Sequence, residues 1–300
     1  MVLDKNIYFS FLKIKYKYDY QYIISILNNE ADFPYVFFKG ESLSYYAYGE
    51  PWKRHFGDID MLINRKDVSK MESLLARHGF VSKHLTREEK IFINAFSHQT
   101  PPLRKKTKRG MIEIDLNFDI LWGDWRGMRP NLESFFERRE RIRMFDVTVP
   151  TLNPQDYFLA LCLHHYKDMN NIYHLSDHNT IITEKFLDIS NFWIRQKNRI
   201  DIDETRKWMD KYELTPFFFY IFTLTCEIFD LPDLKSWAEE LKTEGGKTLL
   251  SKYGLNASER KVWSIGFLER LDNPDLPSIV NADLTERDKK MLEVNRKIFG

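Results

Sequence analysis

Residues 57–63, Gly-Asp-Ile-Asp-Met-Leu-Ile, carry the strongest structural signal in the chain. Apolar and acidic residues alternate along this stretch, and a period of two is typical of a half-buried strand. The isoleucines and the methionine fall on one face, which places Asp58 and Asp60 together on the other. Two carboxylates at this distance repel each other unless a cation lies between them, and Mg²⁺ prefers oxygen ligands. The stretch therefore predicts a strand with a metal-binding acidic pair; a solvated strand surface is the alternative.

A second acidic strand is predicted over residues 111–118, where apolar and polar residues alternate again. Glu113 and Asp115 share its polar face. Three carboxylates from two neighbouring strands can hold two divalent ions, which stabilise the attacking and leaving oxygens of a phosphoryl transfer. We therefore expect Asp58, Asp60 and a third acid to hold Mg²⁺ or Mn²⁺. The pattern leaves the choice of the third acid, Glu113 or Asp115, open.

A strand, a turn and a helix start are predicted upstream of the acidic pair. The aromatic run at residues 35–38 is typical of a strand, Lys39-Gly40 ends it, and Ser42 supplies a hydroxyl at the start of a helix. Such a turn presents backbone N–H groups and a helix N-terminus to phosphate. Lys39 and Arg54 are candidates for neutralising phosphate charge, and solvated surface cations are the alternative.

The character of the sequence changes near residue 150. Short β-like runs mix with helices before it, and mostly helical patterns follow it. The change coincides with a helix start at residues 151–156, where Asn153 precedes Pro154. We expect an α/β domain over residues 1–150 and a helical domain over residues 151–300 that closes a cleft over base and acceptor.

Composition excludes several classes of protein. Forty-five Lys and Arg residues against 44 Asp and Glu residues give a net charge of +1, which argues against an extended nucleic-acid partner. The dense basic run at residues 104–109 is then a solvated hairpin tip, or an arm that grips a triphosphate tail or an anionic acceptor. Cys162 and Cys226 are too few and too distant for a zinc knuckle. Without a signal peptide or a membrane-spanning run, we expect a cytoplasmic protein with no membrane partner.

These motifs resemble the bacterial uncharacterised nucleotidyltransferases, a family of the superfamily shared with DNA polymerase β. The matching residues are Lys39-Gly40 in the turn, Arg54, the stretch from Gly57 to Leu62, Gly79-Phe80 after the next helix, and Leu161-Cys162-Leu163-His164. The resemblance implies an α+β fold, with a polymerase β-like nucleotidyltransferase domain of mixed sheet and helices followed by a mostly helical domain. It makes Glu113 the family-matched third acid, while Asp115 on the same face remains a second candidate.

The resemblance also implies a reaction. A nucleoside monophosphate would pass from a nucleoside triphosphate, such as ATP, to an acceptor hydroxyl with release of pyrophosphate, and Glu113 or Asp115 would serve as general base. His164 and the polar Asp188 of an apolar helix are candidate acceptor or cleft residues. The expected nucleotide- and phosphate-binding residues are Lys39, Gly40, Ser42, Arg54 and Gly57.

The acceptor is expected to be a small molecule. The alternatives are a protein- or RNA-modifying enzyme of the toxin–antitoxin kind and an inactive nucleotide-binding scaffold. The intact set of acids argues against the inactive scaffold, because like charges kept together repel each other without a ligand to hold.

Overall fold

The computed structural model describes residues 5–54, 57–122 and 129–299. The chain forms two compact units, one of residues 1–119 and 131–153 and one of residues 120–130 and 154–300. The second unit thus takes residues 120–130 from within the segment that the sequence assigns to the first domain.

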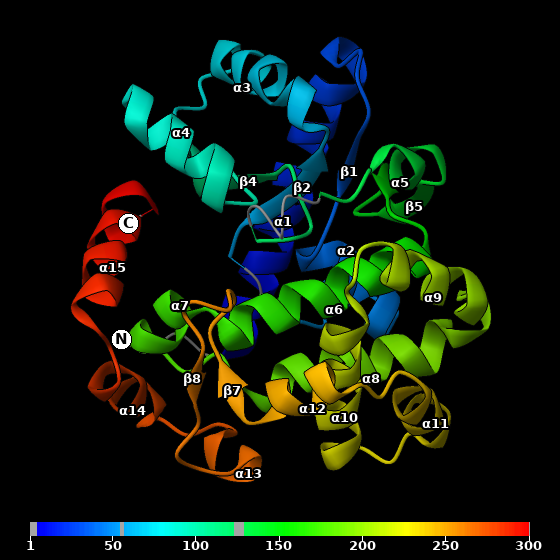
Figure 1. Cartoon of the computed structure of the whole chain (residues 1–300). Coiled ribbons are helices and arrows are strands. Elements are labelled where there is room, and N and C mark those ends of the chain that lie inside the picture. The colour runs from blue at the N-terminus through cyan, green and yellow to red at the C-terminus, as the bar shows by residue number, and fades with distance from the viewer. Residues whose placement is uncertain (1–4, 55–56, 123–128, 300) are drawn as a thin grey trace. The chain divides into compact units, whose positions relative to one another are not determined.

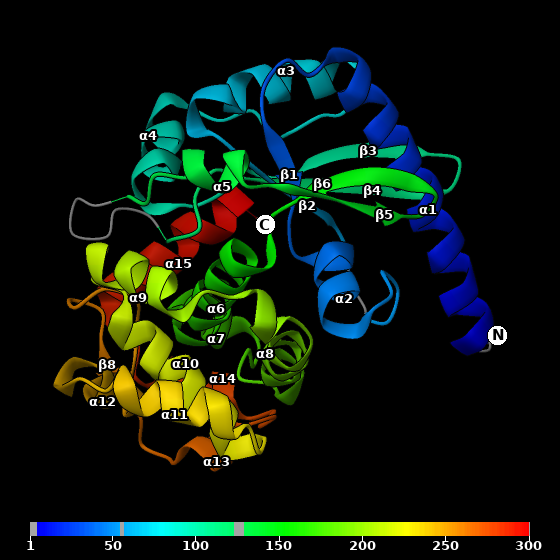
Figure 2. The ribbon, with the colours of Figure 1, turned by 90° about the vertical axis from the view of Figure 1, so that its right-hand side faces the viewer.

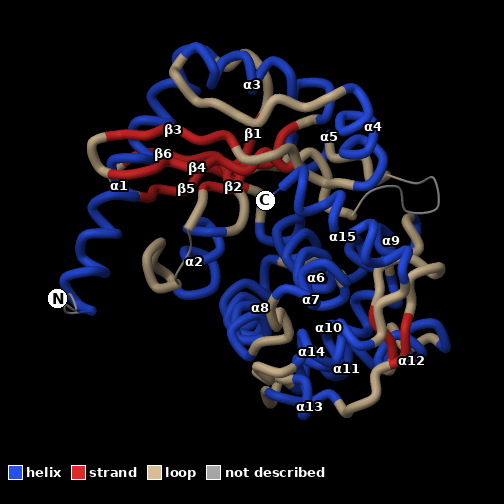
Figure 3. Tube along the Cα trace, turned by 90° about the vertical axis from the view of Figure 1, so that its left-hand side faces the viewer, coloured by secondary structure: helices blue, strands red, loops and turns tan. Residues whose placement is uncertain are grey.

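A mixed six-stranded sheet forms the centre of the first unit (Figure 3). The elements of this unit are α1 (Lys5–Glu30), β1 (Tyr35–Phe37), α2 (Gly40–Tyr48), β2 (Ile59–Ile63), α3 (Val68–Arg77), α4 (Arg87–Phe96), β3 (Leu103–Thr107), β4 (Gly110–Asn117), α5 (Glu133–Glu137), β5 (Glu140–Met144) and β6 (Val147–Thr151). The strand order is β3-β4-β2-β1-β6-β5.

Both acidic strands are present, and they are neighbours in the sheet. The predicted strand at residues 57–63 forms β2, and the one at residues 111–118 forms β4. The two run parallel, with Ile59 opposite Ile114 and Asp60 opposite Asp115. β1 pairs antiparallel with β2 and parallel with β6. At the two edges of the sheet, β3 pairs antiparallel with β4, and β5 pairs antiparallel with β6. The parallel register brings the acids of two strands onto one stretch of the sheet.

Helices cover both faces of this sheet. α2 lies on one face, and α3 and α4 lie on the other (Figures 2 and 3). α3 is amphipathic and buries Met71, Leu74 and Leu75. Gly79, with a φ of 80°, follows its end. Val81 then makes an isolated bridge to Arg104.

The second unit is mostly helical (Figure 1). Its elements are α6 (Pro154–Asn170), α7 (Ile172–Asp177), α8 (Thr183–Gln196), α9 (Ile202–Lys211), α10 (Thr215–Ile228), α11 (Pro232–Glu240), α12 (Glu244–Leu250), β7 (Lys252–Tyr253), β8 (Lys261–Val262), α13 (Phe267–Arg270), α14 (Leu276–Ala282) and α15 (Glu286–Phe299). Short 3₁₀ helices occupy Arg65–Asp67 in the first unit and Lys197–Arg199 here.

Aromatic packing holds the second unit together. α10 contacts α6, α8, α11 and α12. The ring of Phe158 on α6 stacks against Phe192 on α8 and Phe222 on α10, with ring centroids 5.7 Å apart in both pairs. Trp237 on α11 completes the cluster, with its ring centroid 4.9 Å from that of Phe222. A mixed sheet followed by a helical region confirms the predicted α+β fold class.

The structure also describes the two cysteines and the length of the helices. Cys162 and Cys226 are both free thiols. Among the helices of the described ranges, none combines the length and the apolarity that a membrane span needs.

Candidate active site

Three carboxylates meet where β2 and β4 run side by side. Asp60 and Asp115 are register partners, and Asp58 lies just before β2. The turn before α2 comes close to the same place, because a Cβ atom built on Gly40 would lie 3.8 Å from the carbonyl oxygen of Asp58. Asp60 is buried, and Asp58 and Asp115 are half-buried. The structure therefore brings the predicted acidic pair, one of the two candidate third acids and Gly40 together.

The protonation equilibria reflect this crowding of negative charge. Burial, followed by the charge of Asp60, raises the pKa of Asp58 to about 6. Burial, followed by the charges of Asp60 and Asp58, raises the pKa of Asp115 to about 7. An acid whose pKa is raised in this way holds its charge at a cost, and a bound cation would remove that cost.

The ammonium group of Lys39 is the cation that faces these acids. Its Nζ lies 2.7 Å from Oδ1 of Asp60, and the two side chains are only 12 % and 8 % exposed. Nζ also donates to Oδ1 of Asn117 at 3.2 Å. Its charge lowers the pKa values of Asp58 and Asp115, against the effect of burial. Lys39 is thus held inside the acidic cluster.

The backbone of Lys39 is strained. Its φ of 61° and ψ of −152° lie in a region that is almost exclusive to glycine. Strain of this kind persists only where surrounding structure enforces it, and it gathers at functional sites. Leu43 donates a backbone hydrogen bond to the Lys39 carbonyl, which fixes the turn at the start of α2.

The two candidate third acids differ in their surroundings. Glu113 is bound by Arg104 of β3, with Nε 2.6 Å from Oε2 and a second nitrogen 3.2 Å from Oε1. Asp115 receives a hydrogen bond from Gln99 at Oδ2, 3.0 Å away. Its buried Oδ1 has no hydrogen-bond partner among the described residues. The geometry therefore favours Asp115 over the family-matched Glu113 as the acid that turns towards a ligand.

The remaining predicted phosphate-binding residues lie around the turn. The hydroxyl of Ser42 is buried and donates to the carbonyl oxygen of Lys39 at 2.8 Å, so it stabilises the turn itself. Arg54 is half-buried, and its backbone N–H donates to Oγ of Ser44. Gly57 is exposed, and no described residue places an atom within 4 Å of a Cβ atom built on it. Within the described ranges, no close approach requires glycine at position 57.

The predicted acceptor residues belong to the second unit, where both take part in ion pairs. His164 lies 3.3 Å from Asp168, one turn along α6. Asp188 of α8 is fully buried, and its Oδ2 lies 3.6 Å from Nε2 of His165. The buried pair joins α6 to α8.

His164, His165 and Asp168 also satisfy the spacing of a metal site, since their ligand atoms lie within 4.8 Å of one another. Lys185 and Lys167 lie 2.7 Å and 3.4 Å from the same aspartate. Although burial opposes it, His164 and these lysines hold the pKa of Asp168 well below its usual range. An ammonium group already neutralises the carboxylate, so the arrangement is that of an ion-pair network.

Sequence reasoning missed the residues that support the acids. Asn117 is buried, and its Nδ2 donates to Oδ1 of Asp60 at 3.2 Å. The period-two pattern that singled out Glu113 and Asp115 also reaches Asn117, which was therefore detectable. Gln99 precedes β3, and no local pattern marks it.

Glu41 is a further acid behind the site. It is fully buried at the start of α2, and the hydroxyl of Tyr20 donates a hydrogen bond to its carboxylate. Burial raises its pKa well above the usual value, and the charges of Asp58 and Asp60 raise it further. Glu41 is therefore a buried acid whose ionisation is disfavoured by its surroundings and by the neighbouring Asp58 and Asp60.

The donor set fits an oxygen-preferring divalent ion. Asp58, Asp60 and Asp115 offer carboxylate oxygens, and the unpaired Oδ1 of Asp115 is a buried acceptor that such an ion would satisfy. The ammonium of Lys39 already contacts Asp60, so a metal ion would share or take over that carboxylate.

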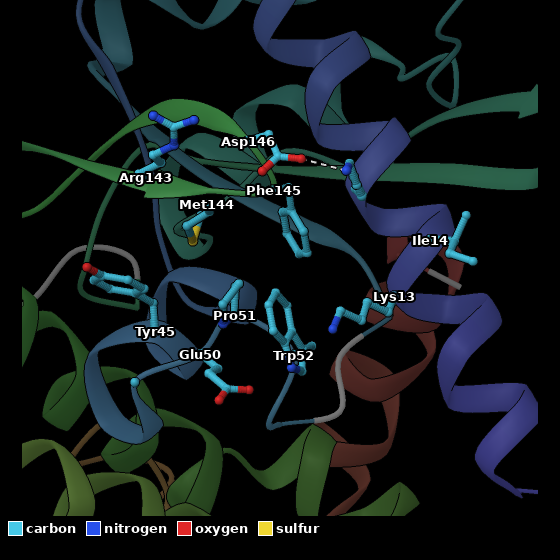
Figure 4. A pocket seen from close by; sticks show the side chains of 12 residues that line it. Lys13, Ile14, Tyr45, Glu50, Pro51, Trp52, Arg143, Met144, Phe145 and Asp146 are labelled. Atoms are coloured by element: carbon cyan, nitrogen blue, oxygen red, sulfur yellow. Dashed lines mark hydrogen bonds and ion pairs between the residues drawn. The ribbon is translucent and has the colours of Figure 1, made fainter.

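A cavity of about 530 Å³ opens elsewhere on the first unit (Figure 4). It lies between α1, the end of α2 and the β5–β6 hairpin, and Lys13, Trp52 and Phe145 line it. The ammonium of Lys13 lies 3.6 Å from the centre of the Trp52 ring. None of the predicted site residues lines this cavity, so it is separate from the acidic cluster.

Both a protein family and a solved structure are similar to this chain. A crystal structure of an antigenic nucleotidyltransferase-like protein from Paracoccidioides brasiliensis is similar over 74 % of this chain and 91 % of that one, with 13 % sequence identity and a TM-score of 0.39. No curated protein matches the sequence. Residues 14–230 match the family described as uncharacterised nucleotidyltransferase, a span that contains both acidic strands and the turn at Lys39. The chain belongs to the family of uncharacterised nucleotidyltransferases.

Proposed function

We propose that this protein transfers a nucleoside monophosphate from a nucleoside triphosphate to the hydroxyl of a small-molecule acceptor. The proposal rests above all on the meeting of Asp58, Asp60 and Asp115 on two parallel strands. Membership of a nucleotidyltransferase family supports the general reaction.

The side chains have distinct roles in this proposal. Asp58 and Asp60 hold divalent ions, Mg²⁺ or Mn²⁺, which when bound stabilise the charge on the attacking and leaving oxygens. Asp115 takes the proton of the acceptor hydroxyl, because its buried Oδ1 has no hydrogen-bond partner among the described residues and is a carboxylate oxygen that can accept a proton. A bond forms between the acceptor oxygen and the α-phosphorus, the bond from that phosphorus to the bridging oxygen breaks, and pyrophosphate leaves. Lys39 pairs with a phosphate oxygen.

The surroundings of the basic run at residues 104–109 support a small acceptor over RNA. Arg104 is bound to Glu113. Lys105 donates a hydrogen bond to the backbone carbonyl of His78 at 2.6 Å. Cationic side chains that already pair with groups of the same chain contribute less to the binding of an RNA backbone than solvated ones do.

The test is an incubation of the protein with Mg²⁺, each of the four α-labelled nucleoside triphosphates and a cell extract split by size. We expect release of pyrophosphate and label in the low-molecular-weight fraction. Asp60→Asn should abolish both, and Lys90→Met, at an exposed position on α4, should leave both unchanged. Label confined to protein or RNA would contradict the small acceptor. The absence of pyrophosphate release with every nucleotide and fraction would contradict the enzymatic proposal.

A further inference from the structure

We propose that Lys39 is a resident counter-ion that competes with the divalent ion for Asp60, so that metal binds well only when a triphosphate draws the lysine away. The inference rests on the proposed function, in that the acidic cluster is taken to hold a divalent ion. It adds a coupling between metal and nucleotide that neither the fold nor the family assigns.

The contacts of Asp60 carry the first step. Its Oδ1 accepts from Lys39 at 2.7 Å and from Nδ2 of Asn117 at 3.2 Å. Lys39 in turn donates to Oδ1 of Asn117, which closes a triangle of the half-buried Lys39 with the buried Asp60 and Asn117. A divalent ion that binds this oxygen must displace the ammonium or share the oxygen with it, and two cations at such a distance repel each other strongly.

The charge balance carries the second step. Lys39 acts on all three carboxylates, because its charge also lowers the pKa values of Asp58 and Asp115. The other nearby cation, Arg104, is committed to Glu113. In the absence of metal, Lys39 is therefore the main charge that compensates the cluster.

The backbone carries the third step. Lys39 keeps a side chain at φ 61°, ψ −152°, where glycine would be free of strain, and Gly40 follows it with a φ of 42°. Fold stability alone would favour glycine at this position. A lysine at this strained position indicates that its ammonium is needed at Asp60. An incoming triphosphate offers that ammonium a stronger partner through charge-assisted hydrogen bonds.

Substitution of Lys39 by methionine separates the two ligands. Lys39→Met removes the charge and keeps the length of the side chain, so Mn²⁺ should bind about tenfold or more tightly without nucleotide. Tripolyphosphate in the presence of EDTA should bind about tenfold more weakly, because its cationic partner is gone. Electron paramagnetic resonance of free Mn²⁺ measures the first affinity, and calorimetry measures the second. A purely structural role would weaken both.

Two further variants complete the test. Lys90→Met removes an exposed lysine of the same unit and should change neither affinity. Lys39→Gly removes the charge and the backbone strain together, so it should show the same gain in Mn²⁺ affinity even if Lys39→Met folds poorly. Mn²⁺ binding that stays equal to wild type, or weakens, in folded Lys39 variants would overturn the inference. If neither wild type nor variants bind Mn²⁺ or tripolyphosphate, the proposed function itself fails.

Discussion

Replacing Asp115 by asparagine should stabilise the metal-free protein while removing its activity. The carboxylate is half-buried beside Asp60 and Asp58, which raises its pKa to about 7 from an ordinary value of 3.8. An acid with a raised pKa binds its proton more tightly in the folded state than in the unfolded state. The free energy of unfolding therefore falls as pH rises between these two values. Asparagine keeps the shape and cannot become charged, so the variant escapes this loss.

The size of the effect follows from the two pKa values of Asp115. The folded and unfolded pKa values differ by about three, which is a thousandfold change in the protonation equilibrium. At 1.36 kcal/mol for each tenfold change, this corresponds to about 4 kcal/mol. Partial exposure of the carboxylate to solvent reduces this to about 2 kcal/mol at neutral and alkaline pH. The hydrogen bond from Gln99 survives, because the amide oxygen of asparagine can accept it.

Urea unfolding in EDTA at two pH values measures the difference. At about pH 8, Asp115→Asn should be about 2 kcal/mol more stable than wild type, and at about pH 4 the two should be nearly equal. Glu113→Gln is the matched control. Because Glu113 is paired with Arg104 near the surface, the stability of the Glu113→Gln variant should differ from that of wild type by less than about 0.5 kcal/mol at both pH values. A gain that is the same at both pH values, or that appears in Glu113→Gln, would refute the reasoning.

Substitutions at three other positions test individual features of the fold, each by urea unfolding. Lys39→Gly should be more stable than Lys39→Ala by about 1 kcal/mol, since only glycine tolerates this backbone without strain, and equal stabilities would contradict the strain. Asp188→Ala should lower the free energy of unfolding by about 3 kcal/mol, because it leaves His165 buried without its carboxylate; a loss below about 1 kcal/mol would argue against a structural pair. Tyr20→Phe should cost about 1–3 kcal/mol, because it removes the hydroxyl that binds the buried carboxyl of Glu41, and an unchanged stability would show that this carboxyl has another donor.

Alternation in the sequence was enough to locate the two acidic strands. A period of two fixes which residues share a face, so Asp58 with Asp60 and Glu113 with Asp115 could be paired from the sequence. Their meeting in space required the parallel pairing of β2 with β4, which no local pattern specifies. The structure supplies that pairing.

The choice of the third acid could not be made from the sequence, for a definable reason. Glu113 and Asp115 share one face of β4, and a strand pattern treats them alike. The hairpin register places Arg104 opposite Glu113, and this pairing takes Glu113 out of the cluster. Likewise, the conformation of Lys39 depends on the turn that joins β1 to α2, and composition does not encode it.

The net charge of +1 conceals a local imbalance that explains what the acidic cluster can bind. Most charges near the site are balanced within the chain, as Arg104 balances Glu113. At the junction of β2 and β4, however, three carboxylates face the single ammonium of Lys39. When all are ionised, the deficit equals the charge of one divalent ion. A metal ion that takes Oδ1 of Asp60 would displace the ammonium of Lys39 from it, and a triphosphate that arrives with the ion supplies a new partner for that lysine. A site with this balance is suited to the metal–nucleotide complex as a unit, more than to either component alone.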